Sequence, residues 1–306
     1  MITCASFGQG ITKVSLHRAD PARLCINDRF SKELAYYQLD TLIDKPLGLL
    51  VLLPGLGELP FQVFAQSALA MKAARAGIVT IVPSLNSRVY LDSPSRIFLD
   101  EVIRAALTTH NIAGNKVVMG GFSAGGHLAL AYTQVLYKDS LRTGVRPRAV
   151  FGIDPAVDLT NLWERAKRMT SENRNEAIEQ EGERILRSLK RAFGGSPQQY
   201  PQKYTSHSPF TASSPGAGNA QYLVSVPVRI YCEPDLDFWR QFSLEYKDLN
   251  AESAGAMISF LQQSGNNQAQ FIKTTGKGFR GTTRFPHAWS IVDAAECIDW
   301  LQHHLR

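Results

Sequence analysis

The sequence predicts an α/β protein with a mostly parallel, twisted sheet that carries helices on both faces. Short apolar, β-branched runs recur along the chain and are separated by longer helix-like segments. The runs lie at residues 47–53, 77–82, 116–120, 149–153 and 228–232. A strand that is apolar on both faces belongs to a sheet covered on both sides. Alternating strands and helices imply parallel pairing through right-handed crossovers.

The segments between these runs are the expected crossover helices. Residues 63–75 are rich in good helix formers, and residues 124–137 follow a predicted strand after a very short turn. Residues 95–110 carry apolar side chains at helical spacing, with Ser93 or Ser95 as the candidate N-cap.

Two regions depart from the alternation. The first 46 residues contain two possible strands, 11–17 and 34–39, with no helix between them, which indicates an antiparallel edge. Residues 159–204 are charged and helical in character, and they separate two predicted core strands. We therefore expect one domain over residues 1–306, with 159–204 as a helical lid inserted into it.

Composition excludes several function classes. The chain of 306 residues is 44% hydrophobic and 20% charged, which is typical of a soluble globular protein. It has no apolar run of 18 residues and no secretory signal pattern, so we expect no membrane span and a cytoplasmic location. The net charge of +6 is scattered and no nucleic-acid-binding module is recognisable, so we expect no nucleic-acid partner.

The four cysteines argue against a metal site. Cys4, Cys25, Cys232 and Cys297 are far apart and form neither a CxxC pair nor a cluster with histidines. Neither a zinc site nor a disulfide framework is indicated, and free thiols are expected.

The sharpest motif is Gly121-x-Ser123-x-Gly125, which lies between a predicted strand and a predicted helix. A nucleophile at such a tight turn has a strained backbone and projects its hydroxyl from the sheet. The residues two before and two after it must be small, because strand and helix crowd there. The helix N-terminus offers N–H groups to a developing oxyanion. The alternative, a phosphate-binding glycine turn, lacks the GxGxxG and GK[ST] spacings.

On this motif, the chain from residue 47 to its C-terminus resembles the α/β-hydrolases, in particular their esterase, lipase and serine-peptidase-like branch. The resemblance implies the chain order nucleophile, acid, histidine, with an oxyanion loop after an early strand. It also implies an acyl ester as substrate and no metal or organic cofactor.

The resemblance places the histidine between the last strand and the terminal helix. Residues 271–275 and 291–303 fit that strand and helix, and His287 lies on the loop between them. An imidazole titrates near neutral pH, so it can take a proton from Ser123 and return it to a leaving group. The other six histidines fit this position less well.

The resemblance places the acid in the loop that follows the strand at residues 226–232. Asp235 is the preferred acid, and Asp237 and Glu233 are alternatives in the same loop. Asp154 ends the preceding strand and is a further alternative, because some hydrolases take the acid from that position. The carboxylate must hold the histidine tautomer and stabilise its protonated form.

Two backbone amides are expected to form the oxyanion hole. One belongs to Ala124, directly after the nucleophile, and the other to Leu56 or Gly57 in the glycine loop at residues 54–58. Pro54 departs from the resemblance, since many esterases have a histidine at this position.

The sequence therefore predicts a serine hydrolase that cleaves an ester, and less readily an amide, through an acyl-enzyme on Ser123. Two alternatives stay open: a binding or scaffold protein of the same fold without turnover, and an acyltransferase or lyase with the same triad. The substrate and the oligomeric state are left open.

Overall fold

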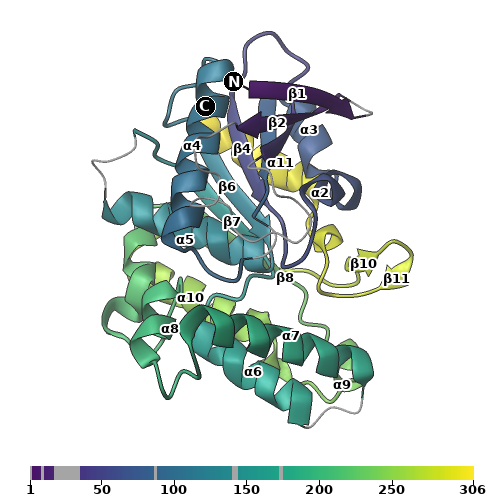
Figure 1. Cartoon of the computed structure of the whole chain (residues 1–306), viewed down its shortest axis with the longest axis vertical. Coiled ribbons are helices and arrows are strands. Elements are labelled where there is room, and N and C mark those ends of the chain that lie inside the picture. The colour runs from purple at the N-terminus through teal and green to yellow at the C-terminus, as the bar shows by residue number, and fades with distance from the viewer. Residues whose placement is uncertain (1, 8–9, 17–34, 86–87, 140–143, 172–174) are drawn as a thin grey trace.

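The computed structural model describes residues 2–7, 10–16, 35–85, 88–139, 144–171 and 175–306. Within these ranges, nine strands form one sheet in the order β1-β2-β3-β5-β4-β6-β7-β8-β9 (Figure 1). Strands β4 to β9 run parallel, whereas β1, β2 and β3 form an antiparallel edge. The bounds are β1 Ile2–Phe7, β2 Ile11–Leu16, β3 Ala35–Leu39, β4 Gly48–Leu53, β5 Ile78–Pro83, β6 Val117–Phe122, β7 Ala149–Ile153, β8 Val228–Cys232 and β9 Ala269–Lys273.

Helices cover both faces of the sheet, as the apolar strands predict. In β4, Leu49, Val51 and Leu53 pack in one core, whereas Leu50 and Leu52 pack in the other. The first core takes residues from α4 (Ser93–Thr109), α5 (Ala124–Lys138) and α10 (Asn250–Gln263). The second takes residues from α2 (Pro60–Gln66), α3 (Leu69–Arg75) and α11 (Ala294–Leu305). All of β4 is buried, which explains its unbroken apolar sequence.

The predicted strands agree with the structure to within a few residues at each end, and the predicted antiparallel edge is confirmed. Strand β1 pairs with β2 and was not predicted. His17 and Leu34, the outer ends of two predicted strands, lie outside the described residues.

Two helix predictions were wrong in detail. The single helix expected over 63–75 is two helices, α2 and α3, and the Ser67 hydroxyl between them accepts a hydrogen bond from the Leu69 amide at 3.2 Å. The N-cap of α4 is Asp92 rather than Ser93 or Ser95, since its carboxylate accepts from the Ser95 amide at 2.9 Å. The helix thus begins where a carboxylate satisfies its free N–H groups.

Between β7 and β8 the chain forms α6 (Leu159–Ser171), α7 (Glu176–Phe193) and α8 (Pro201–His207), which we call the cap. The cap lies beyond the end of the sheet (Figure 1) and has a small core of its own, which includes Leu189, Phe193 and Tyr204. Helix α7 ends at Gly194, whose φ of 89° is left-handed.

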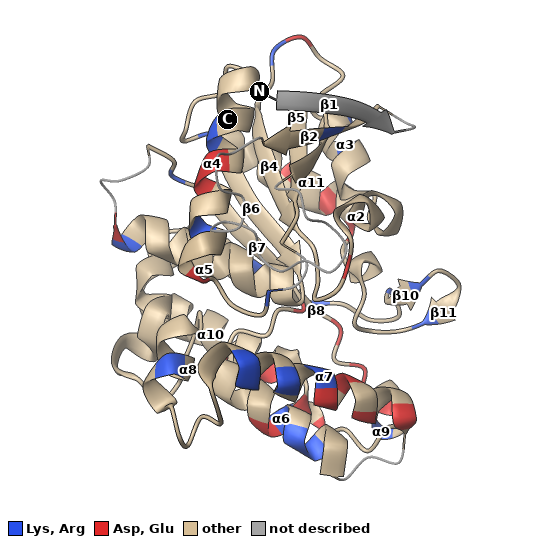
Figure 2. Ribbon diagram, viewed as in Figure 1, with Lys and Arg blue, Asp and Glu red and all other residues tan. Residues whose placement is uncertain are grey.

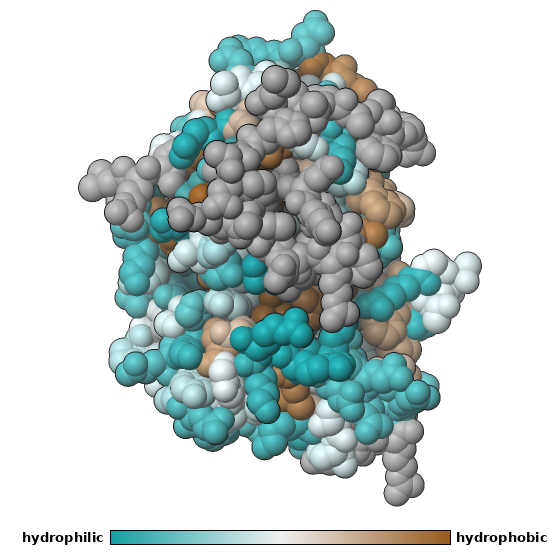
Figure 3. All heavy atoms as spheres, in the orientation of Figure 1, coloured by the Kyte–Doolittle hydropathy of each residue, from teal (hydrophilic) through white to brown (hydrophobic). Residues whose placement is uncertain are grey.

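The cap is the most densely charged part of the view in Figure 2, where α6 and α7 alternate basic and acidic residues. In Figure 3 the described surface is mostly polar, and apolar surface shows where the cap meets the rest of the molecule and in smaller areas elsewhere. Among the described helices, none is both long enough and apolar enough to cross a membrane.

A substitution at Gly125 tests how tightly α5 packs on the sheet. A Cβ atom here would lie 2.0 Å from the backbone oxygen of Leu53, so we expect Gly125→Ala to lower the free energy of unfolding by at least about 2 kcal/mol. The matched control is Gly255→Ala in α10, where the nearest atom is the Tyr246 hydroxyl at 3.9 Å. Urea denaturation of both variants measures the effect, and equal stabilities would contradict the packing described.

Candidate active site

Ser123 occupies the tight turn between β6 and α5. Its φ of 53° and ψ of −117° are strained for a residue with a side chain. The turn is held because the Ser123 amide donates to the Ile153 carbonyl at 2.8 Å. A Cβ atom on Gly121 would lie 2.4 Å from the backbone carbon of Gly125. The small residues expected on both sides of the serine are therefore required by steric crowding between the end of β6 and the start of α5.

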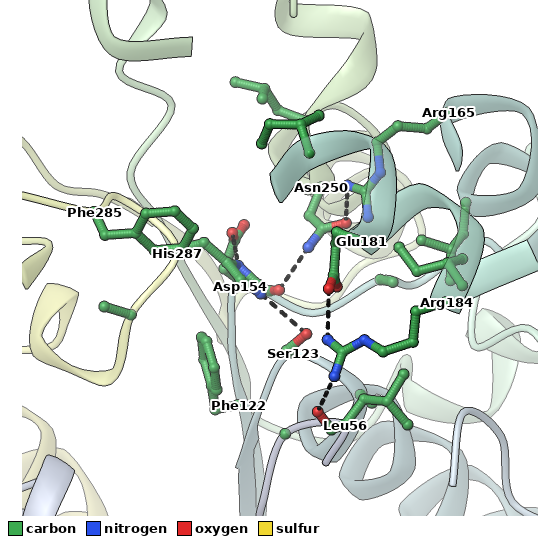
Figure 4. Close-up of a pocket in the computed structure, with 18 of the residues that line it drawn as sticks. Leu56, Phe122, Ser123, Asp154, Arg165, Glu181, Arg184, Asn250, Phe285 and His287 are labelled. Carbon is green, nitrogen blue, oxygen red and sulfur yellow. Dashed lines mark hydrogen bonds and ion pairs between the residues drawn. The ribbon is translucent and has the colours of Figure 1, made fainter. Parts of the chain in front are cut away.

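The His287 ring bridges the serine and a carboxylate (Figure 4). Its Nε2 atom lies 3.1 Å from the Ser123 hydroxyl, and its Nδ1 atom lies 2.5 Å from a carboxylate oxygen of Asp154. The ring packs on Phe122 with a centroid distance of 4.6 Å. Both polar side chains are mostly shielded, with 22% of His287 and 14% of Asp154 exposed. This arrangement can move a proton from the hydroxyl to the ring while the carboxylate holds the ring in place.

The prediction that Asp235 orients the histidine is wrong in this geometry. Asp235 caps helix α9 (Leu236–Arg240), accepting from the Phe238 amide at 3.0 Å, and pairs with Arg284 at 2.5 Å. The alternative acid, Asp237, is also wrong, because its side chain is 98% exposed and pairs with Arg240 at 3.6 Å. Helix capping and ion pairing therefore use both carboxylates away from the His287 ring.

Glu233 anchors the loop that carries the histidine instead of contacting the ring. It accepts hydrogen bonds from the amides of Lys277 and Gly278, at 2.8 Å and 3.2 Å, and it pairs with Arg284. Because Arg284 pairs with both Glu233 and Asp235, the acidic loop after β8 is tied to the segment before His287.

Asp154 is fixed by its backbone. Its φ of 45° is left-handed, its amide donates to the Tyr231 carbonyl at 2.7 Å, and its carbonyl accepts from the Asn250 side chain at 2.8 Å. Sequence reasoning did not find Asn250. Asp154 was weighed only as an alternative, because its position at the end of a strand also fits a turn residue.

The glycine loop after β4 contains Leu56 and Gly57, one of whose amides is expected to act with the Ala124 amide on an oxyanion. Gly57 has a φ of 82°, which a glycine adopts without strain. Among the described residues, the amides of Leu56 and Gly57 have no hydrogen-bond acceptor, so both are free to donate. Arg184 of the cap donates to the Leu56 carbonyl at 3.2 Å and holds this peptide in place.

Glu58 supports this loop and was missed by sequence reasoning. Its carboxylate accepts from the Gly55 amide at 2.8 Å and from the Trp289 indole at 2.8 Å. It thereby connects the loop after β4 to the segment that carries His287. Burial raises the pKa of Glu58, although its two hydrogen bonds oppose that shift. Glu58 and Trp289 are far apart in the sequence, and no local sequence pattern indicates that their side chains form a hydrogen bond.

The side chains of Ser123, Asp154 and His287 line a cavity of about 510 Å³ between the sheet and the cap. Its walls combine the glycine loop, the serine turn and the histidine loop with residues of α6 and α7, including Leu162, Arg165 and Ile178. Within the described ranges, no group of three or more His, Cys, Asp or Glu side chains is arranged to hold a metal ion.

Comparisons with known proteins agree with this architecture. No protein-family model matches the chain, and no curated protein matches it by sequence. Among solved structures, an arylesterase has a TM-score of 0.61 at 14% identity, covering 99% of this chain and 86% of its own. Carboxyl esterase 2 of Tuber melanosporum has a TM-score of 0.59 at 15% identity, with coverages of 99% and 86%. An S-formylglutathione hydrolase of Agrobacterium tumefaciens has a TM-score of 0.54 at 12% identity, with coverages of 100% and 99%.

The chain has the α/β-hydrolase fold. Within this α/β-hydrolase fold, Ser123 follows β6, Asp154 follows β7 and His287 follows β9. Ser123 and Asp154 therefore lie at the carboxyl ends of parallel strands, where open α/β sheets bind their ligands. His287 meets them there from the loop that follows β11 (Thr283–Arg284).

The raised pKa of Glu58 predicts a pH dependence of stability. Between the ordinary value of 4.5 and the higher value in the folded protein, the folded state binds the proton more tightly than the unfolded state. Stability from this group therefore falls as the pH rises through that window. We expect the unfolding free energy of the wild type minus that of Glu58→Gln to decrease with rising pH, in urea titrations between about pH 4 and 8. Glu183→Gln on the exposed side of α7 is the matched control, and a difference for Glu58→Gln that rises with pH would contradict the assignment.

Proposed function

We propose that this protein is a serine hydrolase that cleaves carboxylic esters through an acyl-enzyme on Ser123, with His287 as base and Asp154 as acid. The observation that carries the proposal is the continuous contact from Asp154 through His287 to Ser123, at 2.5 Å and 3.1 Å. A hydroxyl next to an oriented imidazole is the arrangement that makes serine nucleophilic.

In the first half of the reaction, the Ser123 oxygen attacks the ester carbonyl carbon while its proton moves to Nε2 of His287. The carbonyl oxygen becomes an oxyanion, which the Ala124 amide and a Leu56 or Gly57 amide stabilise. When the intermediate collapses, His287 returns the proton to the departing alkoxide. Water then attacks the acyl-enzyme by the same route and releases the carboxylic acid.

Asp154 keeps Nδ1 of His287 protonated and stabilises the imidazolium that forms at each attack. The short contact to Nδ1 and the hydrogen bonds that fix the backbone of Asp154 support this role. An ester substrate is favoured because two of the neighbouring structures described above are named as esterases.

A fluorophosphonate probe tests the nucleophile directly. We expect it to label Ser123 in the folded protein, and we expect Ser123→Ala to lower kcat for a short p-nitrophenyl ester by at least about 10³-fold. Ser264→Ala, at the exposed end of α10, is the control and should keep full activity. If neither the wild type nor Ser123→Ala cleaves the ester and the probe does not label Ser123, the result would favour a binding protein without turnover.

Two aspartate variants separate the competing acids. Asp154→Asn should lower kcat by about 10³- to 10⁴-fold, because the amide favours the wrong tautomer of His287. Asp235→Asn should leave kcat within about threefold of the wild type, since its partners are an amide and Arg284. Steady-state kinetics on one ester compare the two. A larger loss of kcat with Asp235→Asn than with Asp154→Asn would contradict the assignment of Asp154 and favour Asp235, in the loop after β8, as the acid.

A further inference from the structure

Arg165 of the cap lines the cavity that contains Ser123. Its Nη1 atom donates to the side-chain oxygen of Asn250 at 2.6 Å and to the backbone oxygen of Asp248 at 3.4 Å (Figure 4 shows the first contact). Both acceptors are neutral. Its Nε atom is buried and has no partner among the described residues.

No carboxylate of the described residues lies within 4.0 Å of the Arg165 guanidinium. The carboxylates that act on it from farther away are each engaged elsewhere: Asp248 by Arg168, Glu181 by Arg184 and Asp154 by His287. Burial lowers the pKa of Arg165, and the charges of those three carboxylates only partly oppose the shift. The Arg165 side chain is half-buried and its Nε atom fully buried. A cation largely shielded from water without a direct counter-ion is costly, so such a charge is expected to meet an anion.

The other arginines of the cavity differ from Arg165. Arg184 has 47% of its side chain exposed and pairs with Glu181. Arg280 is exposed, stacks over the Phe285 ring at 4.0 Å and donates to the His287 carbonyl. Only Arg165 among these three combines a buried donor without a partner with a position on the cavity wall.

We propose that Arg165 binds a carboxylate of the substrate, so that the preferred substrates are half-esters of dicarboxylic acids. The proposal rests on the proposed function of the same site. A guanidinium pairs with a carboxylate through two parallel hydrogen bonds, which adds orientation to affinity. Apolar side chains of the cap, including Leu162, Met169 and Ile178, also line the cavity, and they suit the methylene chain between the carboxylate and the ester.

Binding to the Ser123→Ala variant tests the proposal without turnover. Isothermal titration calorimetry compares the monomethyl esters of succinate, glutarate and adipate with the matched dimethyl esters. We expect at least one half-ester to bind about tenfold or more tightly than its dimethyl ester. Adding Arg165→Gln should abolish that preference. Adding Lys167→Gln should leave the preference unchanged. This substitution removes the same charge from the same helix, but at a side chain that is 57% exposed.

Equal affinities within every pair, or a preference that survives Arg165→Gln, would overturn the proposal. If Arg165→Gln does not fold, Arg165→Lys decides, since loss of paired hydrogen bonding should reduce the preference several-fold and an unchanged preference would count against the site. Fluorophosphonate labelling of the wild type is measured in parallel. A reactive Ser123 without half-ester preference removes only the role of Arg165, whereas a preference with an unreactive Ser123 removes only the hydrolase.

Discussion

The placement of the His287 ring between two strand ends is the constraint on which the site depends. Asp154 and Ser123 end neighbouring parallel strands, β7 and β6, whereas His287 arrives from a loop far along the chain. That loop is held from two sides, by Glu233 through backbone amides and by Glu58 through the indole of Trp289. Two carboxylates outside the chain of contacts from Asp154 through His287 to Ser123 therefore hold the imidazole in place.

Two backbone positions of the site are strained. Ser123 and Asp154 both have left-handed φ angles, 53° and 45°, although neither is glycine. Each is held by hydrogen bonds to a neighbouring strand, Ser123 to Ile153 and Asp154 to Tyr231. Such conformations persist where the surrounding structure determines them, and here they aim both side chains at one ring.

The cap contacts both halves of the site through arginines. Arg184 holds the carbonyl of Leu56 in the glycine loop after β4. Arg165 holds the Asn250 side chain, which in turn holds the backbone of Asp154. The cap therefore does more than cover the cavity, because its position is coupled to the glycine loop and to the backbone of Asp154.

The sequence by itself determined the alternation of core strands with helices, the turn at Ser123 and the loop of His287. These features rest on local periodicity, on small residues beside the serine and on the position of a histidine before the last helix. Tertiary structure decided which carboxylate meets the ring. Asp235 and Asp154 both follow core strands, and only the folded chain shows that a helix N-terminus and Arg284 engage Asp235. Asn250, Glu58 and Arg165 escaped prediction for the same physical reason: their partners are distant in sequence, and contacts between distant residues leave no local pattern.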